Sequence, residues 1–417
     1  MRQNSSARNH KGIIAAAASA LLLLSAFSLG GPAAETRISS GYDSFIDRYT
    51  VLENDTTESL NEYYLNMVNR YSGKISGVGA NFRNSLKFGN QTVDERFRVS
   101  LDSGSPGSLQ VGIETDFFLK HFREGSDYSF SNDYRQLNTG LKIGKRFSEK
   151  LRIRSRSRFE LVDYDEHTDF DYDYHYIDTG IECDAGSILE NGFRLAASLG
   201  TRQAPDTTEL NYRRTILEGS AYLGGWDGAG IDLSVSADRR DYNGGSRPSS
   251  WLIISYSKIS LIRGDKPGFS IIFDGESYMY DYTDQLYFDT HFIRGGMEFT
   301  IPAWKNSRFS FQPRYARLLC DQLEEERYSE YSLMASYDFM YGNGYWFSLS
   351  YEPGYRQYQL EDIYSNFTFS RVSLMGSVSV YRSFSVDLFL MHDPEKHTRR
   401  GDDFSITLIS ASLSASF

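Results

Sequence analysis

Apolar and polar residues alternate with a period of two along most of the chain, from Val78 to its end. In residues 109–120, for example, apolar side chains fill alternate positions, and Gln110, Glu114 and Asp116 lie between them. This period is typical of β-strands, whereas a helix repeats every 3.6 residues. Alternating segments of about 10 residues separated by short polar clusters are the pattern of a transmembrane β-barrel.

The last stretch, residues 402–417, shows the alternation most clearly. Ile409, Ala411, Leu413, Ala415 and Phe417 fall on one side of an extended strand, and serines fall on the other. This stretch resembles the closing strand of Gram-negative outer-membrane β-barrels, in which a terminal Phe after alternating apolar positions is the insertion signal. The resemblance implies that Phe417, Ala415 and Leu413 form an assembly signal for the barrel-assembly machinery. It also implies an outer-membrane location, in contact with lipids and lipopolysaccharide.

We therefore expect an all-β protein, a transmembrane antiparallel up-and-down β-barrel of about 18 strands, within a range of roughly 16 to 20. The barrel is expected to occupy residues 74–417. Compact turns with Gly or Pro alternate with longer acidic loops, and a last strand that descends to the periplasm places the turns inside and the loops outside. A secreted soluble propeller or sandwich would also alternate, but the terminal Phe and the long strands favour the membrane barrel.

The N-terminal residues 1–34 have the pattern of a secretory signal peptide. A basic lead precedes an apolar run rich in Ala and Leu, and small residues follow, so cleavage is expected near Ala33 or Ala34. A single anchoring helix is the alternative for this run. Residues 35–73 are acidic and alternate weakly. They form either a periplasmic arm that docks a partner or a first weak strand pair.

Composition excludes several classes of protein. No internal run of about 20 apolar residues occurs, which excludes a helical membrane protein. The net charge of -11 makes nucleic acid a poor partner. Cys183 and Cys320 are expected at opposite rims and therefore unpaired. Two cysteines are too few for a Cys-rich metal site, and no cofactor is expected.

The most charged segment, 151–161, indicates what lines the lumen. Its polar face carries residues about 6.6 Å apart along the strand, and these are Arg152, Arg154, Arg156, Arg158 and Glu160. A hairpin folded about the following loop places Arg156 near Asp178 and Arg152 near Glu182. Such pairs would form a rigid ladder of ion pairs or a charged track for anionic or zwitterionic solutes. Other segments add Glu114, Asp116 and Lys142 to the predicted lining.

Several local features carry further expectations. Pro313 predicts a bulge or bend, because a barrel strand needs the amide that proline lacks. Residues 169–184 change face near Tyr176 and Ile177, which also predicts a bulge. The acidic run 163–173 is expected to be a solvated outer loop, because it lacks the spacing of an EF-hand. Tyrosines near strand ends predict aromatic girdles at the membrane interfaces, with a sugar-binding path inside the lumen as the alternative.

A barrel of this size has room for an aqueous channel, so we expect passive or guided passage of small solutes. The outer loops look too short for a bulky plug, and no N-terminal plug domain is expected. One alternative is a structural or export subunit of a larger envelope assembly, such as a polysaccharide exit port. Another is a rim hydrolase that uses His121, His291 or His392. No Gly-x-Ser-x-Gly or His-Glu-x-x-His motif occurs, so no enzyme is expected.

Overall fold

The computed structural model describes residues 33–51, 54–104, 108–123, 132–166, 171–187, 191–226, 229–244, 247–261, 267–284, 286–342, 344–361, 363–381 and 383–417. These residues form 20 strands and three single-turn 3-10 helices. No helix among them is long and apolar enough to cross a membrane.

The strands follow one another along the chain. They are β1 (Ala33–Val51), β2 (Asn54–Ile75), β3 (Val78–Gly89), β4 (Thr92–Ser103), β5 (Leu109–Phe122), β6 (Tyr134–Ser148), β7 (Leu151–Tyr164), β8 (Tyr174–Ser187), β9 (Asn191–Gln203) and β10 (Tyr212–Trp226). The second half has β11 (Ala229–Tyr242), β12 (Ser250–Leu261), β13 (Gly268–Tyr280), β14 (Thr290–Pro302), β15 (Ser307–Cys320), β16 (Tyr328–Tyr341), β17 (Tyr345–Tyr358), β18 (Phe367–Tyr381), β19 (Phe384–His397) and β20 (Phe404–Ser416).

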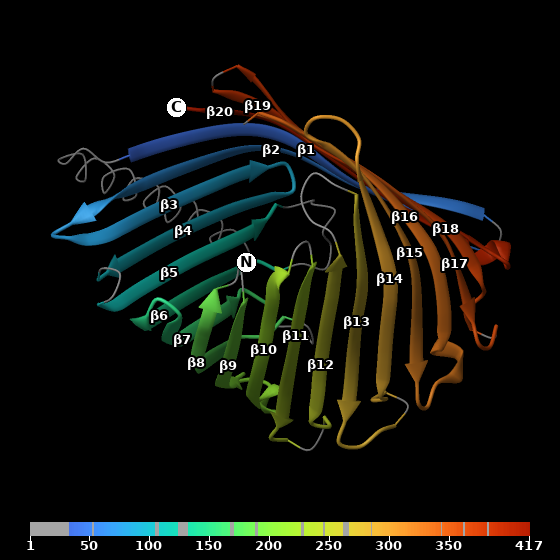
Figure 1. Ribbon diagram of the computed structural model, residues 1–417, viewed down its shortest axis with the longest axis horizontal. Helices are drawn as coiled ribbons and strands as arrows, with labels where there is room; N and C mark the ends of the chain where they lie inside the picture. The colour runs from blue at the N-terminus through green and yellow to red at the C-terminus, as the bar shows by residue number, and fades with distance from the viewer. Residues whose placement is uncertain are drawn as a thin grey trace, which may run out of the picture.

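The sheet closes on itself. Each strand pairs antiparallel with its neighbours in the chain, and β1 also pairs with β20 from Arg37–Ser416 to Tyr49–Phe404. Figure 1 shows β1 alongside β20, although the two strands lie at opposite ends of the barrel sequence. Closure leaves no strand edge exposed along the seam. The prediction of an antiparallel all-β barrel is confirmed, and the count of 20 lies at the upper end of the expected range.

Of the two alternatives for residues 35–73, the structure shows the strand pair, because these residues form β1 and β2 of the wall. The barrel therefore begins at Ala33 and not at residue 74. The two strands pair from Ala33–Ser72 to Val51–Asn54, whereas β2 pairs with β3 only from Tyr64 onward. The β1–β2 hairpin therefore extends beyond β3. The predicted signal peptide lies outside the described residues except for Ala33 and Ala34, with which β1 begins.

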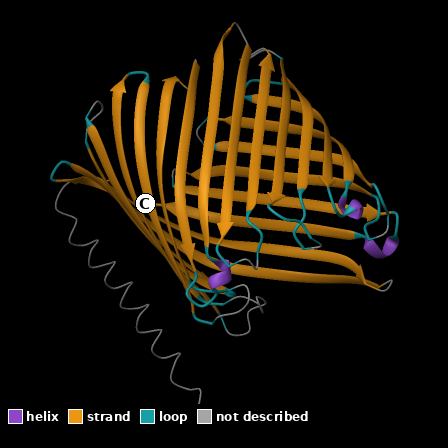
Figure 2. Cartoon of the chain, turned by 90° about the horizontal axis from the view of Figure 1, so that it is seen from below, coloured by secondary structure: helices purple, strands orange, loops and turns teal. Residues whose placement is uncertain are grey.

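The two rims of the barrel differ in their connections. The loop rim, which follows the odd-numbered strands, carries the long connections such as 165–173 and 243–249. It also carries the helical turns η1 (Thr208–Leu210), η2 (Glu324–Glu326) and η3 (Arg400–Asp402), drawn in purple at the strand ends in Figure 2. The turn rim carries compact turns and the C-terminal end of β20. At Ser76 and Gly77 both φ angles are positive (49° and 84°), as in a type I′ hairpin turn.

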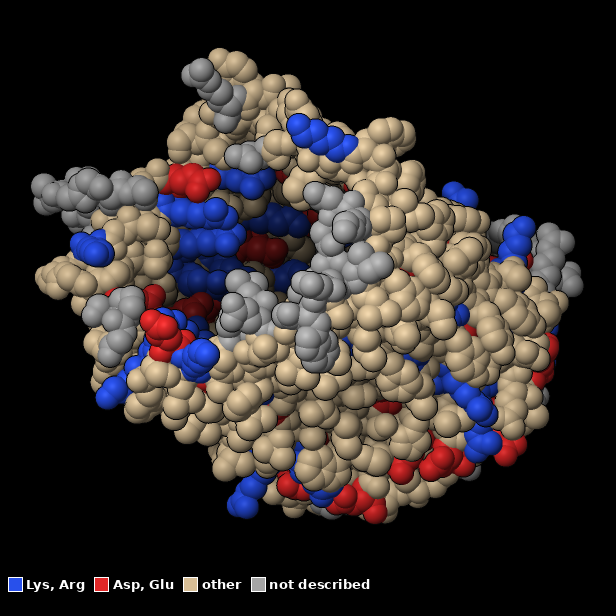
Figure 3. Space-filling model, in the orientation of Figure 1, with Lys and Arg blue, Asp and Glu red and all other residues tan. Residues whose placement is uncertain are grey.

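Alternation gives the wall an apolar outer face and a polar inner face. Outward-facing side chains such as Leu199, Leu195 and Ile181 are 67%, 56% and 58% exposed. Figure 3 shows mostly uncharged residues on the outer wall and rows of Lys and Arg inside a hollow. Cys183 on β8 and Cys320 on β15 are both free thiols.

Pro313 does not cause the predicted bulge. The register between β14 and β15 is the same on both sides of it, at Gly296–Arg314 and at Phe299–Phe311. Only the hydrogen-bond ladder is interrupted there, because proline has no amide proton to donate. The ladders between β16 and β17 and between β18 and β19 are interrupted in the same way beside Pro353 and Pro394.

The bulge predicted in β8 is also absent. Pairing between β7 and β8 runs without a shift from Val162–Tyr174 to Leu151–Ala185. The apparent change of face arose because tyrosine was taken as a membrane-facing residue. Tyr176 in fact points into the lumen and is 5% exposed, whereas Ile177 points outward and is 51% exposed.

Glycine provides the space for Tyr176. A Cβ atom at Gly200, on the neighbouring strand β9, would lie 2.5 Å from the Tyr176 hydroxyl oxygen. At Gly140 on β6, which also faces the lumen, a Cβ atom would meet nothing closer than 3.8 Å. The two positions therefore test whether this close approach contributes to stability.

We expect Gly200→Val to lower the free energy of unfolding by about 1–3 kcal/mol, because the valine would displace the packed Tyr176 ring. Urea unfolding of the protein folded into lipid vesicles measures the change. Gly140→Val is the matched control and should cause no such loss. Equal losses in the two variants would contradict the packing argument.

Candidate functional site

The predicted basic ladder lies on β7, and its side chains share the lumen face with polar residues of β6 and β8. The register is displaced by two residues from the expected one. Arg154 lies opposite Glu182 and Arg158 opposite Asp178, in place of the predicted pairs of Arg152 with Glu182 and of Arg156 with Asp178. The hairpin folds about a point one residue later in the loop, and this shift moves every cross-strand pair by two positions.

Arg154 is the centre of a network of ion pairs. It contacts the Glu182 carboxylate, and its guanidinium lies 2.7 Å from Asp184. Arg194 on β9 approaches the same Glu182 to 2.5 Å. Three strands are thus tied together on the inner face, which corresponds to the rigid ladder expected from the sequence.

The other ladder residues differ in their partners. Arg158 contacts Glu160 and donates to Asn138 at 3.2 Å. Glu160 also accepts from Gln136 and Tyr174, both at 2.9 Å. Arg152 lies near the turn rim and donates to Gln110 at 3.2 Å.

Arg156 is exposed to the lumen and has no ion pair or hydrogen bond among the described residues. Its register partners are Lys142 on β6 and Gly180 on β8. Lys142 itself lies 3.3 Å from Glu114. Asp178 likewise has no side-chain partner in the described part of the chain. Arg156 therefore presents a guanidinium without a direct partner near the middle of the wall.

A second basic group, which the sequence did not reveal, crosses β2, β3 and β4. Arg70, Arg83 and Arg98 lie directly opposite one another in register. Like charges in this arrangement repel, because directly opposite side chains lie about 5 Å apart. These arginines are far apart in the sequence, and only the pairing of the strands brings them together. The alternation of apolar and polar residues is also only moderate in these segments.

Acidic residues compensate this basic row only in part. Arg98 lies 2.7 Å from Asp116 and 3.5 Å from Glu114, and the Arg96 Nε donates to the same Asp116 at 2.9 Å. Arg70 lies 3.6 Å from Glu35, near the start of β1. Arg83, in the middle of the row, has no carboxylate partner among the residues described. Figure 3 shows the basic side chains that line the hollow on this part of the barrel.

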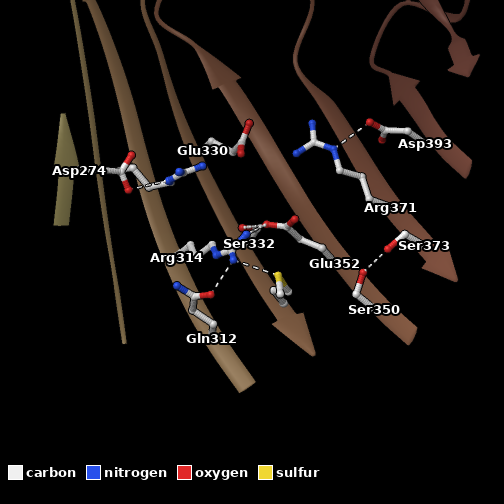
Figure 4. A network of polar contacts seen from close by, with 12 residues as sticks. Asp274, Gln312, Arg314, Glu330, Ser332, Ser350, Glu352, Arg371, Ser373 and Asp393 are labelled. Carbon is white, nitrogen blue, oxygen red and sulfur yellow. Dashed lines mark hydrogen bonds and ion pairs between the residues drawn. The ribbon is translucent and has the colours of Figure 1, made fainter. Parts of the chain in front are cut away.

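On the opposite wall, from β13 to β19, the described lumen-facing arginines are paired with carboxylates. Figure 4 shows Arg314 beside Glu352 and Arg371 beside Asp393, at 3.2 and 2.8 Å. On β14 to β18, every lumen-facing arginine that the structure describes has a carboxylate within 3.4 Å: Arg294, Arg308, Arg314, Arg356 and Arg371. Uncompensated positive charge is therefore confined to one side of the lumen.

Aromatic residues line the lumen near the loop rim. The members of this aromatic belt are Tyr134, Tyr164, Tyr174, Tyr212, Tyr242, Tyr280, Tyr328 and Tyr358. The rings meet in cross-strand pairs such as Tyr134–Tyr164, with centroids 5.4 Å apart. Arg202 lies over Tyr174, 3.9 Å from the ring centroid, without a carboxylate partner in the described residues. In the adjoining loop, a hydrogen bond to Glu326 raises the pKa of the Tyr364 phenol.

The sequence predicted that tyrosines near strand ends form girdles at the membrane interfaces. The aromatic belt corrects this prediction for most of them, because their side chains face the lumen. Tyr174, Tyr176, Tyr278, Tyr280 and Tyr358 all point inward. Outward-facing tyrosines do occur on β17: Tyr351, in the middle of the strand, is 47% exposed, and Tyr355, near its loop-rim end, is 37% exposed. Period-two alternation divides the residues of a strand between its two faces. A tyrosine is found on either face, so its presence does not show which face is turned to the lipid.

The three candidate histidines lie on separate strands and do not converge. His121 on β5 contacts Asp133, His291 on β14 lies 3.0 Å from Ser277, and His392 on β19 lies 2.9 Å from Thr407. No cluster of potential metal ligands occurs within the described ranges.

A Ser-His-Asp contact that the sequence did not predict ties two connections of the loop rim. Ser365 lies 3.0 Å from His397 Nδ1 and donates to Asp402 at 2.6 Å. The serine is 1% exposed, and its proton is engaged by the carboxylate. This arrangement serves to hold the loops and gives no exposed nucleophile.

The C-terminal residues close the barrel at the turn rim. Phe417 N donates to Thr36 O at 2.8 Å, and the reverse bond from Thr36 N is 3.1 Å. Leu413 and Phe417 are 50% and 72% exposed, and Ala415 shares their outward face. The residues predicted as an assembly signal thus lie together on the outer wall beside the seam.

Comparison with known proteins identifies relatives in fold only. No protein-family model matches the sequence, and no curated protein matches it. Among solved structures, the alcaligin outer-membrane receptor FauA of Bordetella pertussis has a TM-score of 0.53 at 11% identity, covering 91% of this chain and 76% of FauA. The copper transporter OprC has a TM-score of 0.56 at 7% identity, covering 92% of this chain and 82% of OprC. OpdQ of Pseudomonas aeruginosa has a TM-score of 0.50 at 12% identity, covering 92% of this chain and 98% of OpdQ.

These structures confirm the resemblance that the closing strand suggested. The chain has the fold of the Gram-negative outer-membrane β-barrels. At such low identities the comparison concerns the fold alone, so the function has to be argued from this chain's own residues.

We expect Asp116→Asn to lower the unfolding temperature of the barrel, and to do so more at low salt than at high salt. Removing the carboxylate leaves Arg83, Arg96 and Arg98 to repel one another, and about 1 M salt screens this repulsion to a Debye length of about 3 Å. Heating the folded protein and following its mobility on gels at both salt concentrations measures the effect.

Asp393→Asn is the matched control. Its partner Arg371 still has Glu352 opposite it on β17, so the loss should depend little on salt. An Asp116→Asn loss that is the same at both salt concentrations would show that the arginine row is not under electrostatic strain.

Proposed function

We propose that the protein is an outer-membrane channel that passes small solutes and favours small anions. The observation that supports it is the pair of uncompensated guanidiniums, Arg83 and Arg156, on the lumen face of a closed 20-stranded wall. Barrels of 16–18 strands already leave an aqueous channel, whereas an 8-stranded barrel is filled by its side chains.

The uneven charge of the lumen supports the preference for anions. A guanidinium that is already paired has little attraction left for a passing solute, and this is the state of the wall from β13 to β19. Arg83 and Arg156 retain their charge and their hydrogen-bond donors, which suit carboxylate and phosphate groups. Positive charge on one wall of a pore raises the local concentration of anions.

The proposal includes an orientation. The loop rim faces the outside and the turn rim faces the periplasm, as the asymmetry of connections in outer-membrane barrels suggests. Phe417, Ala415 and Leu413 would then reach the assembly machinery from the periplasmic side. The apolar outer face would contact the membrane lipids. An export role docked through residues 35–73 finds less support, because those residues belong to the wall.

We expect the refolded protein to conduct ions in planar bilayers and to prefer chloride over potassium. Changing Arg83 and Arg156 to Glu should shift the reversal potential in a salt gradient toward that of a cation-selective pore. Arg317→Glu is the matched control, because Arg317 has the same charge but lies on the outer face of β15. It should leave selectivity unchanged.

The two parts of the proposal can fail separately. Absence of conductance from a correctly folded barrel would contradict the channel. Conductance whose reversal potential is the same in the Arg83→Glu, Arg156→Glu double variant as in the original protein would contradict only the anion preference.

A further inference from the structure

An apolar row crosses the lumen face at the seam between the first and last strands. Its members lie directly opposite one another on β19, β20, β1 and β2, and they are Met391, Leu408, Phe45 and Leu60. Figure 1 shows these four strands side by side. Phe45 is 38% exposed although it faces the lumen, whereas the same face of β20 carries serines closer to the turn rim. The row therefore presents apolar surface to the inside of the barrel.

The same row explains why residues 35–73 alternate only weakly in the sequence. Phe45 faces the lumen, and the next residue, Ile46, faces outward. Leu408 and Ile409 divide between the two faces of β20 in the same way. The period-two pattern weakens wherever both faces of a strand are apolar. The apolar residues on the inner face thus interrupt the alternation that otherwise marks the wall.

A hollow of about 390 Å³ lies at this row. Its lining includes three members of the row, Phe45, Leu60 and Leu408, together with Phe389 on β19. Five charged side chains line the same hollow: Asp43, Glu62, Lys87, Asp94 and Lys120. Pockets for small molecules have volumes of about 300–1,000 Å³ and combine apolar walls with a few polar groups. The hollow has both properties.

The charged groups of the hollow do not cancel, because three carboxylates face two ammonium groups. Lys87 is engaged by Glu62 at 2.5 Å. Lys120 lies directly opposite Asp94 in register, yet the Asp94 Oδ1 atom is buried without a hydrogen-bond partner among the described residues. Asp43 has no ion pair in the described part of the chain. The lining is therefore negative, and Asp43 is its carboxylate without a cationic partner.

Further negative charge lies on the other side of the apolar row. Asp47 and Glu58 are directly opposite each other on β1 and β2, and neither has an ion pair among the residues described. Like charges in this position repel. Asp43, in contrast, accepts a hydrogen bond from the Ser410 hydroxyl at 2.7 Å. Carboxylates thus flank the apolar row on both sides, and a cation at the row would relieve their repulsion.

The spacing between charge and apolar surface limits the shape of the ligand. Asp43 and Phe45 lie two residues apart on one face of β1, which is about 6.6 Å along the strand. A ligand that contacts both has its charged group about 5–7 Å from the centre of its apolar group. An inorganic cation would leave the row uncovered, and an organic anion would be repelled by the carboxylates.

We propose that this hollow binds a cationic amphiphile, an organic ammonium ion that carries an aromatic or aliphatic group. The ammonium group binds Asp43, and the apolar group packs on Phe45, Leu408 and Phe389. The faces of the two phenylalanine rings also attract a cation. The site lies on the seam, apart from Arg83 and Arg156, and does not depend on the proposed anion preference.

The test uses the full refolded barrel in detergent micelles, with 2-phenylethylammonium as the probe and isothermal titration calorimetry as the readout. Micelles without protein give the background. We expect one saturable site. The neutral analogue 2-phenylethanol should bind roughly tenfold more weakly, because it cannot form the charge-assisted contact. Methylammonium, which lacks the ring, and 3-phenylpropanoate, which carries the opposite charge, should show no saturable binding.

Variants separate the two halves of the site. Asp43→Asn should weaken binding of 2-phenylethylammonium roughly tenfold and leave that of 2-phenylethanol unchanged, because only the charge is removed. Asp232→Asn is the matched control, since Asp232 is a lumen-facing carboxylate on β11, far around the wall from the seam. It should bind the probe as the original protein does. Phe45→Ser should weaken binding of both compounds.

Several results would overturn the site. They are equal affinities for 2-phenylethylammonium and 2-phenylethanol, equal effects of Asp43→Asn and Asp232→Asn, and the absence of saturable binding to a folded barrel. Unchanged heat-modifiable mobility of each variant on gels shows that its barrel is folded. None of these measurements depends on ion conductance, so the site and the proposed channel can fail separately.

Discussion

Backbone hydrogen bonding between the first and last strands is the constraint on which the rest of this structure depends. In hydrocarbon, every amide and carbonyl group needs a partner within the protein, and a sheet meets this need only by closing. The pairing of β1 with β20 joins residues that are more than 350 positions apart at Arg37 and Ser414, whose side chains also hydrogen-bond at 2.7 Å. Closure fixes the face of every side chain, because a slip of one residue would exchange lumen and lipid faces.

The closed wall makes the two sides of the lumen electrically different. From β13 to β19 each described lumen-facing arginine is paired with a carboxylate of a nearby strand, so this wall presents no unpaired guanidinium to a solute. From β2 to β8 the register brings guanidiniums together, and the available carboxylates do not suffice. A protein that places Arg70, Arg83 and Arg98 opposite one another accepts repulsion between them. An anion in the lumen would relieve this repulsion. The proposed function therefore rests on which arginines lack a carboxylate partner, more than on the number of arginines in the lumen.

The aromatic belt shows how the same residue type serves two environments. Tyrosines inside the loop rim stack with one another and with arginines, as Tyr328 does with Arg356 at 4.2 Å. Those outside, such as Tyr351, lie on the lipid face. Outside the barrel, polarity is concentrated near the loop rim, with Arg213, Arg239 and Asp281, while the middle of the wall is aliphatic. Both faces therefore change character along the barrel axis, as a protein that crosses two interfaces requires.

The sequence by itself determined the local features. Period-two alternation and the apolar outer face of the last strand were sufficient to predict an antiparallel all-β barrel, its alternating turns and loops, and a basic face on β7, because these depend only on neighbours within one strand. Cross-strand features needed the tertiary structure. The shift of the β7–β8 register, the row through Arg83, the inward tyrosines and the inclusion of residues 35–73 in the wall all depend on pairing between strands. That pairing is decided by closure of the whole sheet, which no single segment specifies.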